Sequence, residues 1–174
     1  MSKTLTTPFT LDDIRSLRAG DRVELSGTVY TGRDAAHKRL CTLLDKGESL
    51  PVDLAGQAIY FVGPCPAPPG RPIGSAGPTT SGRMDFYSPQ IIAKCGLRAM
   101  IGKGDRSQAV KDAMKEYGCV YFAATGGAGA LIANSITAAE VVAFDDLGPE
   151  AIYKLTFDKL PLVVAIDSEG NSLY

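Results

Sequence analysis

Three cationic side chains stand where strand-like sequence gives way to a turn. Arg33 follows RVELSGTVYT in the segment TGRD, Arg83 lies in GPTTSGRMD, and Lys103 lies between two glycines in IGKG. Free N–H groups at a helix start favour anions, and an arginine can hold a carboxylate through two parallel hydrogen bonds. If these turns share one edge of a sheet, the cations and the Thr79 hydroxyl would form half of a site for a small dicarboxylate.

Each of these motifs also has an ordinary structural interpretation. The hydroxyls before Arg83 are typical of a helix N-cap, Arg33 of a surface arginine, and Lys103 of a turn lysine that no P-loop pattern precedes. The single histidine, His37, lies one turn into the helix expected after Arg33, where a partly exposed histidine is more usual than a catalyst. The evidence for a site is therefore the expected convergence of the motifs.

The cysteines do not predict a metal site. Cys41, Cys65, Cys95 and Cys119 form no CxxC pair, and their spacing matches neither a zinc nor an iron–sulfur pattern. With one histidine besides, the chain is expected to hold no metal by itself, and its thiols to be reduced and structural.

A glycine-rich segment after the apolar run CVYFAA resembles part of a dinucleotide-binding turn. Gly127 and Gly129 supply the first two glycines, but the third position is Ile132, and the pattern occurs late in the chain. Close packing of a Gly/Ala-rich helix is the alternative.

Strand-like and helix-like segments alternate along the chain, which predicts an α/β domain with a mixed sheet flanked by helices. Residues 1–10 are expected to form an extended arm and residues 11–174 a single domain, with a functional Gly/Pro-rich loop over 63–82. In the helix over 105–118, Asp105 and Gln108 have capping-box spacing and Gly118 ends the helix. The other helices are expected over 11–18, 34–44 and 81–94, and strands over 22–31, 58–62, 99–101, 119–124, 140–144, 153–157 and 162–166.

Composition narrows the class of protein. The 174 residues include 18 Lys and Arg against 19 Asp and Glu, a net charge of −1 that argues against nucleic-acid or anionic-membrane partners. No apolar run approaches the roughly 20 residues of a membrane helix, and the N-terminus lacks a signal-peptide core. We expect a soluble, cytoplasmic protein.

Read together, TGRDAAHKRL, GPCPAPPGRPIGSAGPTTSGRMD and IGKG resemble the C-terminal half of class I, iron–sulfur-dependent fumarate hydratases. The same module occurs as the β subunit of two-chain fumarases and of L(+)-tartrate dehydratase. The resemblance extends from about Leu11 to Asp167 and implies a swivelling β/β/α fold. It implies that Arg33, Thr79, Arg83 and Lys103 bind the substrate, with Thr79 and Lys103 also catalytic.

The resemblance further implies reversible hydration of fumarate to L-malate, a step of the tricarboxylic acid cycle. A cysteine-bearing α subunit would hold the [4Fe–4S] cluster, so this β subunit would be active only with it, in an α2β2 hetero-oligomer; the isolated chain would form a homodimer. Thr79 is the family's candidate for moving the C3 proton, and the partner chain is expected to supply the opposite proton carrier. An apolar patch is expected on the face that carries GPTTSGR. Two alternatives stay open: a tartrate dehydratase β subunit, which converts tartrate to oxaloacetate, and a non-catalytic module that binds a dicarboxylate or a nucleotide.

Overall fold

One curved sheet forms the centre of the computed structural model, which describes residues 2–63, 67, 69–72, 74, 80–124 and 132–174. Its first strands run parallel to their neighbours, and the last two are antiparallel, so the predicted mixed sheet is confirmed. The order is β1-β2-β3-β4-β5-β7-β6. The parallel strands are β1 (Lys3–Thr6), β2 (Arg22–Thr31), β3 (Ala58–Tyr60), β4 (Ala99–Gly102) and β5 (Val120–Ala124); the antiparallel strands are β6 (Ile136–Ala143) and β7 (Ile152–Ile166).

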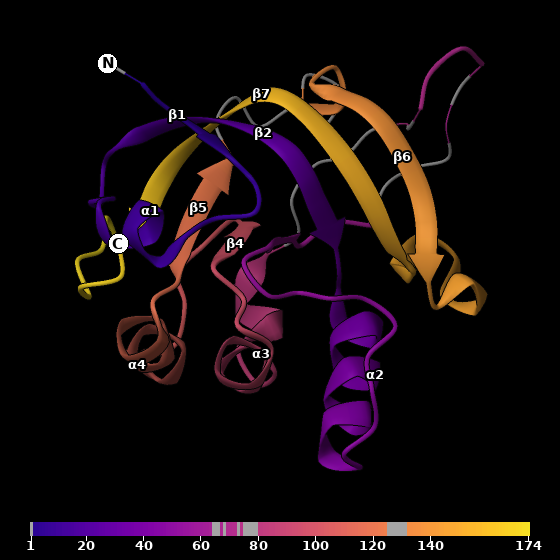
Figure 1. The fold of residues 1–174 in the computed structure, drawn as a ribbon, viewed down its shortest axis with the longest axis horizontal. Helices are drawn as coiled ribbons and strands as arrows, with labels where there is room; N and C mark the ends of the chain where they lie inside the picture. The colour runs from indigo at the N-terminus through magenta and orange to yellow at the C-terminus, as the bar shows by residue number, and fades with distance from the viewer. Residues whose placement is uncertain (1, 64–66, 68, 73, 75–79, 125–131) are drawn as a thin grey trace.

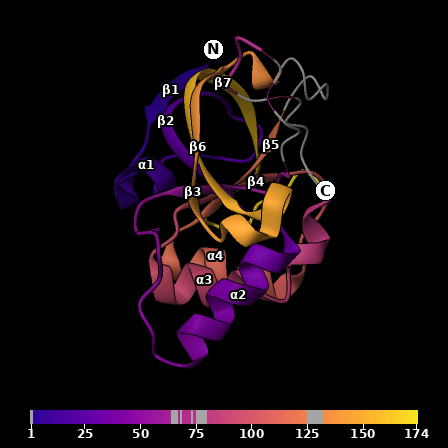
Figure 2. The ribbon, with the colours of Figure 1, turned by 90° about the vertical axis from the view of Figure 1, so that its right-hand side faces the viewer.

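The sheet closes on itself because β7 pairs with β5 and also with β2. Figure 2 shows the resulting ring of strands above the helices. Two separate strands were expected over 153–157 and 162–166, but both belong to β7. The pairing with β2 shifts register between Leu25 and Gly27, and Lys159 adopts a positive φ of 55° at the same level. This bulge bends β7 without ending it, so one strand can pair with β2, β5 and β6.

Helices α2 (Asp34–Asp45), α3 (Ser88–Cys95) and α4 (Gln108–Tyr117) lie together on one side of the sheet, while the short α1 (Leu11–Arg15) lies near β1 (Figure 1). Alternate residues of a strand point to opposite faces, and β3 continues this pattern beyond its end. Tyr60 packs inside the ring of strands, whereas Ile59 and Phe61 pack against the helices. The α/β architecture with flanking helices is thus confirmed. No helix in the described part of the chain is long and apolar enough to cross a bilayer.

The helix expected over 81–94 is divided. A 3-10 helix, η1 (Ser81–Met84), is followed by a break, and α3 then begins at Ser88 with Pro89 in its first turn. Proline lacks an N–H and fits the first turn of a helix, where that donor has no intrahelical partner. The break lets η1 lie on the sheet edge while α3 covers the sheet.

The predicted capping box at Asp105 is wrong. Helix α4 begins at Gln108, and the hydroxyl of its N-cap residue, Ser107, accepts a hydrogen bond from the Val110 N–H at 3.4 Å. The Asp105 carboxylate instead accepts from the Arg106 N–H at 2.7 Å, which removes it from the helix start. The predicted end at Gly118 is confirmed, since that residue has a φ of 83°.

Two further strands differ in length from the sequence-based prediction, one near each end of the chain. Within the expected arm over 1–10, Lys3–Thr6 forms β1 and pairs in parallel with β2. The strand expected over 140–144 begins earlier, as β6, and a 3-10 helix, η2 (Asp145–Glu150), joins it to β7.

Candidate functional site

The carboxyl ends of β2, β3 and β4 lie side by side, because these three strands are parallel neighbours. Arg33 follows β2, Gly63 follows β3, and Lys103 directly follows β4. Ligands of α/β proteins commonly bind at this edge of a parallel sheet. Two of the three predicted cationic turns therefore leave the sheet at one edge.

The third turn reaches the same edge through η1. Thr80 forms a parallel bridge with Lys103, and the Ser81 N–H donates to the Lys103 carbonyl at 2.8 Å. Ser81 is completely buried here, and a Cβ on Gly102 would overlap its hydroxyl. Glycine at 102 is thus required for η1 to lie against β4.

Arg83 continues from η1 toward the start of α2. Its Nε and Nη2 atoms lie 3.1 Å and 2.8 Å from one oxygen, Oδ2, of Asp34. The side chain of Arg83 remains 55% exposed. Its other edge, with Nη1, bonds to none of the described residues. Arg83 is therefore held beside the start of α2, at the residue that follows Arg33.

Arg33 is confined by the neighbouring strand end. An ideal Cβ on Gly63 would lie 2.7 Å from its Nη1 and 3.3 Å from the Pro149 carbonyl oxygen. The Nε of Arg33 and the Oδ1 of Asp34 are buried, and neither has a hydrogen-bond partner among the described residues. An unsatisfied buried polar group costs about 1–3 kcal/mol, so two at one turn require an explanation.

His37 lies beneath Arg33 and is buried, with 1% exposure, so the expectation of a partly exposed histidine is wrong. Its Nδ1 is 2.8 Å from the Arg33 carbonyl oxygen. Because a carbonyl can only accept, the ring proton is assigned to Nδ1. Burial lowers the pKa of His37 to about 4, against the opposing effect of this hydrogen bond. A neutral His37 that packs edge-on against Phe61 supports the turn and is unsuited to general acid catalysis near pH 7.

Sequence reasoning missed Arg106 and Asp85. The Arg106 side chain is fully buried, and its Nε donates to Asp85 Oδ1 at 2.6 Å. The available signal was their position: Asp85 closely follows Arg83, and Arg106 closely follows Lys103. Because an acidic residue follows the Arg83 motif and a basic residue follows the Lys103 motif, an ion pair between the two segments could have been predicted.

Several predicted features lie outside the described residues. They include Thr79, half of the loop over 63–82, Cys65, and the glycine-rich stretch over 125–131. The neighbours of Thr79 on the C-terminal side, Thr80 and Ser81, are described and lie against Lys103.

The described cysteines do not fit an iron–sulfur cluster. Cys41, Cys95 and Cys119 are free thiols, and burial raises their pKa, to about 11 for Cys41 and about 12 for Cys119. Cluster ligands are thiolates, which burial of this kind disfavours. No group of three or more His, Cys, Asp or Glu side chains in the described ranges could hold a metal ion.

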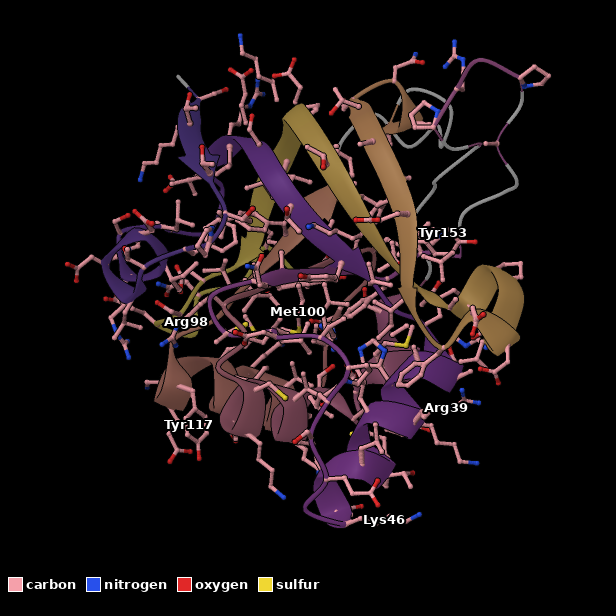
Figure 3. The ribbon with its side chains drawn as sticks, turned by 45° about the vertical axis from the view of Figure 1, so that its right-hand side comes forward. Arg39, Lys46, Arg98, Met100, Tyr117 and Tyr153 are labelled. Carbon is pink, nitrogen blue, oxygen red and sulfur yellow. The ribbon has the colours of Figure 1, made fainter. Side chains whose placement is uncertain are left out.

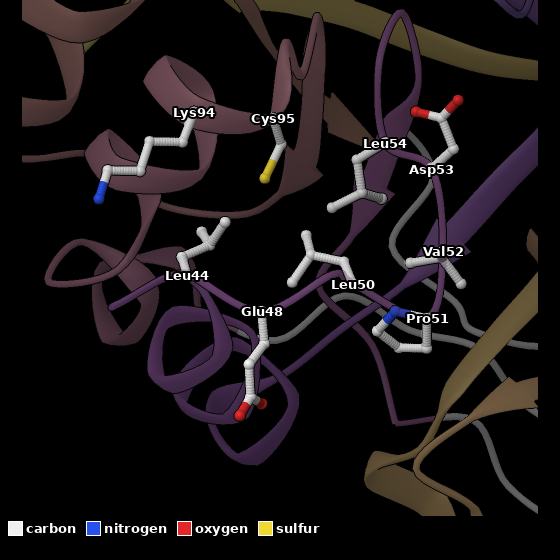
Figure 4. Close-up of a pocket in the computed structure, with 9 residues that line it drawn as sticks. All are labelled: Leu44, Glu48, Leu50, Pro51, Val52, Asp53, Leu54, Lys94 and Cys95. Carbon is white, nitrogen blue, oxygen red and sulfur yellow. The ribbon is translucent and has the colours of Figure 1, made fainter. Parts of the chain in front are cut away.

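A separate pocket of about 410 Å³ lies at the far ends of α2 and α3 (Figure 4). None of the predicted site residues lines it. Its wall is largely aliphatic, with charged groups at its rim, and its lining residues are Leu44, Glu48, Leu50, Pro51, Val52, Asp53, Leu54, Lys94 and Cys95. It lacks the clustered cations that a dicarboxylate requires.

One large apolar side chain stands out beside the cationic edge. Phe86, shortly after Arg83, is 88% exposed and contacts Tyr87 edge-on, with ring centroids 5.3 Å apart. A single exposed ring does not make a surface patch, so the apolar patch expected on the face of the GPTTSGR segment stays a prediction.

Comparison with known proteins places these features in a family. A family model described as "Fumarase C-terminus" matches residues 2–174. The chain is 42% identical over 154 residues to "Fumarate hydratase class I, aerobic" of Escherichia coli strain K12, and 39% identical over 156 residues to "Fumarate hydratase 2" of Leishmania major. These matches cover 88% and 89% of this chain.

The coverage differs between relatives. The chain spans 28% of the length of those two fumarate hydratases. It is also 41% identical over 171 residues to "Putative L(+)-tartrate dehydratase subunit beta" of Methanocaldococcus jannaschii, a match that covers 95% of this chain and 88% of the relative. Since the family model matches residues 2–174, the chain belongs to the fumarase C-terminal family.

Proposed function

We propose that this chain is the β subunit of a hydro-lyase that reversibly hydrates fumarate to L-malate, and that it supplies the carboxylate-binding half of the active site. The observation that carries the proposal is that Arg83 pairs with Asp34, the residue after Arg33, and that the segment bearing Arg83 lies along Lys103 where that residue leaves β4. Two arginines and a lysine from three distant segments thus lie at one edge of the sheet, with the Asp34 carboxylate paired to Arg83.

Fumarate and malate are dianions, so their binding requires two separate carboxylate contacts. The buried Nε of Arg33 has no partner in the described residues and would donate to one substrate carboxylate. Asp34 engages the Nε–Nη2 edge of Arg83, which leaves Nη1 for the same or the second carboxylate. Lys103 would act as a point charge on the remaining oxygens.

Water addition and its reversal pass through an aci-carboxylate, which carries more negative charge than the ground state. Fixed cations already aimed at that position stabilise it more than they stabilise the substrate. Thr79 is the proposed carrier of the C3 proton. Its hydroxyl is a weak base, so it would depend on the neighbouring cations to lower its pKa. The iron–sulfur cluster is assigned to the α subunit, since the described cysteines here do not fit it.

The test is reconstitution. The chain is mixed anaerobically with an α chain that carries the cluster, and fumarate hydration is assayed. We expect activity only in the mixture, and a loss of about 10²–10³-fold in kcat/KM for Arg83→Ala. Arg39→Ala is the matched control, because Arg39 pairs with exposed Asp146 and not with Asp34. Full activity of Arg83→Ala would refute the site assignment, and binding of malate or NAD by a chain that never becomes active would indicate a non-catalytic module.

A tartrate dehydratase β subunit is the second candidate. The relative from M. jannaschii supports it, because that match covers 88% of a protein named as a separate β subunit. Tartrate has one more hydroxyl than malate, and a few pocket contacts can decide between the two substrates. Competing kcat/KM values for malate and tartrate in the reconstituted complex separate these candidates.

A further inference from the structure

Arg106 is a buried arginine at the junction of three strands and two helical segments. Its guanidinium carbon lies 5.0 Å from the Phe61 ring centroid and 5.1 Å from that of Tyr121, so aromatic rings contact the cation. Its Nη1 lies 3.2 Å from the sulfur of Met100, which Figure 3 places between the sheet and the helices. Its Nη2 donates to Ser88 Oγ at 2.8 Å.

Asp85 completes this arrangement. One carboxylate oxygen, Oδ1, accepts from Arg106 Nε at 2.6 Å, and the other, Oδ2, accepts from the Ser107 N–H at 2.8 Å. Asp85 follows directly after η1, which carries Arg83, whereas Arg106 and Ser107 lie in the segment that begins with Lys103. One carboxylate therefore joins the two segments that bear proposed substrate-binding cations.

Tyr121 makes a second connection between the same segments. Its hydroxyl lies 2.7 Å from Ser81 Oγ and 2.8 Å from the Gly104 carbonyl oxygen. Because the carbonyl can only accept, the phenolic proton goes to Gly104 and the Ser81 hydroxyl donates to the phenolic oxygen. The two connections are made on either side of Arg83, at Ser81 and Asp85, and both are made just after Lys103. Arg83 and Lys103 are themselves exposed.

We propose that Arg106 and Asp85 are positioning residues, which hold Arg83 and Lys103 at the separation that a dianionic substrate requires. The inference rests on the proposed function. Long cationic side chains lose considerable rotamer freedom when they are held in place, and a displacement of about 1 Å at a reacting site can cost about 100-fold in rate. The buried Arg106–Asp85 ion pair joins the two segments rigidly. It therefore reduces both the rotamer freedom that Arg83 and Lys103 must lose and the displacement of their charges.

The kinetic test uses the reconstituted complex. Arg106→Lys keeps the charge but loses the forked geometry, and Asp85→Asn keeps the shape but loses the charge. We expect each to lower kcat/KM about 10–100-fold. The matched control is Arg98→Lys: Arg98 donates to the Tyr117 and Gly118 carbonyls at the other end of α4, where Figure 3 shows it beside Tyr117. Arg98→Lys should leave kcat/KM unchanged.

A double-mutant cycle separates positioning from a general loss of stability. If Arg106 acts through Arg83, the effect of Arg106→Lys on kcat/KM shrinks several-fold in an Arg83→Ala background, because the group it positions is gone. The proposal is overturned if the fold-losses in kcat/KM of Arg106→Lys and Arg83→Ala multiply fully in the double mutant. It is also overturned if Arg106→Lys and Asp85→Asn have the kcat/KM of the wild type. Should Arg106→Lys fail to fold, Asp85→Asn carries the test by itself.

Limited trypsin digestion of the full chain tests, without any assay of activity, whether Arg106 and Asp85 hold the two segments together. Release of the two segments should raise the cleavage rates after Arg83 and Lys103 in Arg106→Lys and Asp85→Asn, but not in Arg98→Lys. Equal cleavage in all variants overturns the proposal. If the wild-type complex has no hydro-lyase activity, the proposed function fails, and the digestion result alone decides whether Arg106 and Asp85 hold the two segments together.

Discussion

Asp34 holds Arg83 through a single carboxylate oxygen, which lies 3.1 Å from Nε and 2.8 Å from Nη2. Its second oxygen is buried and has no partner among the described residues. Asp34 is also the first residue of α2, directly after Arg33. The Asp34 carboxylate thus orients the Arg83 guanidinium from a position directly after Arg33 in the sequence.

Replacement of Asp34 by alanine is expected to lower kcat/KM of the reconstituted enzyme about tenfold, because Arg83 loses the partner that orients it. The free energy of unfolding should change by no more than about 1 kcal/mol, since the pair is partly exposed and such pairs contribute little. Steady-state kinetics and urea unfolding measure the two effects separately.

Asp146→Ala is the control for this change. Asp146 accepts two hydrogen bonds from Arg39, at 2.8 Å and 3.0 Å, away from Arg83. Its loss should leave kcat/KM unaltered. Equal kinetic effects of Asp34→Ala and Asp146→Ala would show that Asp34 has no special relation to the substrate site.

Much of the scaffold of this site can be read from local sequence. Apolar alternation predicted β2 over its full length, and the following TGRD segment predicted the start of α2. Both rest on interactions between residues near in sequence. The shared edge of the three motifs follows from the rule that parallel strands present their carboxyl ends together, once an α/β fold is assumed.

The parts that could not be predicted depend on contacts between distant segments. No local signal shows that β7 also pairs with β2, or that Arg106 reaches Asp85 instead of solvent. The position of the α4 N-cap was missed for a local reason: the Asp105 carboxylate accepts from the N–H of the next residue, Arg106, and Ser107 caps the helix. Burial of His37 depends on the rings that pack around it.

Gly63→Ala tests the confinement of Arg33. A Cβ at this position would lie 2.7 Å from Arg33 Nη1 and 3.0 Å from its Cδ, so the arginine must move. Gly63 does not have a positive φ, and the displaced atoms belong to a flexible side chain; stability should therefore change little. We expect kcat/KM to fall about 10–100-fold.

The accompanying measurement is the midpoint of urea unfolding, which should remain close to that of the wild type. A large loss of stability would mean that the methyl group displaces backbone near the Pro149 carbonyl, 3.3 Å from the added atom, and not Arg33. Unchanged kinetics would contradict a role for Arg33 in binding the substrate.

His37 predicts a specific pH dependence of stability. Its folded-state pKa is lowered to about 4, whereas an unfolded histidine titrates near 6.5. Between these values the unfolded chain binds the additional proton, so stability is complete above pH 6.5 and is lost as the pH falls toward 4. The wild type should lose about 2 kcal/mol of unfolding free energy from this group between pH 7 and pH 5.

The comparison variant is His37→Gln, which keeps an N–H donor for the Arg33 carbonyl oxygen but does not titrate. Urea unfolding at pH 7 and pH 5 should show a smaller pH effect in this variant, whatever its stability at pH 7. The same loss between the two pH values in both proteins would mean that other groups cause it.

Phe86 makes the last prediction, which concerns the proposed α subunit. A phenyl ring that is 88% exposed beside the cationic edge is unfavourable in water, and exposed aromatic residues often anchor interfaces. Phe86→Ser should weaken binding to the α chain about tenfold or more, without lowering the stability of the isolated chain. Tyr117→Ser is the control, since Tyr117 is also an exposed aromatic, 41% accessible, but is the last residue of α4, where Figure 3 labels it beside Arg98. Calorimetric titration with the α chain measures both, and equal affinities for the two variants would place the interface elsewhere.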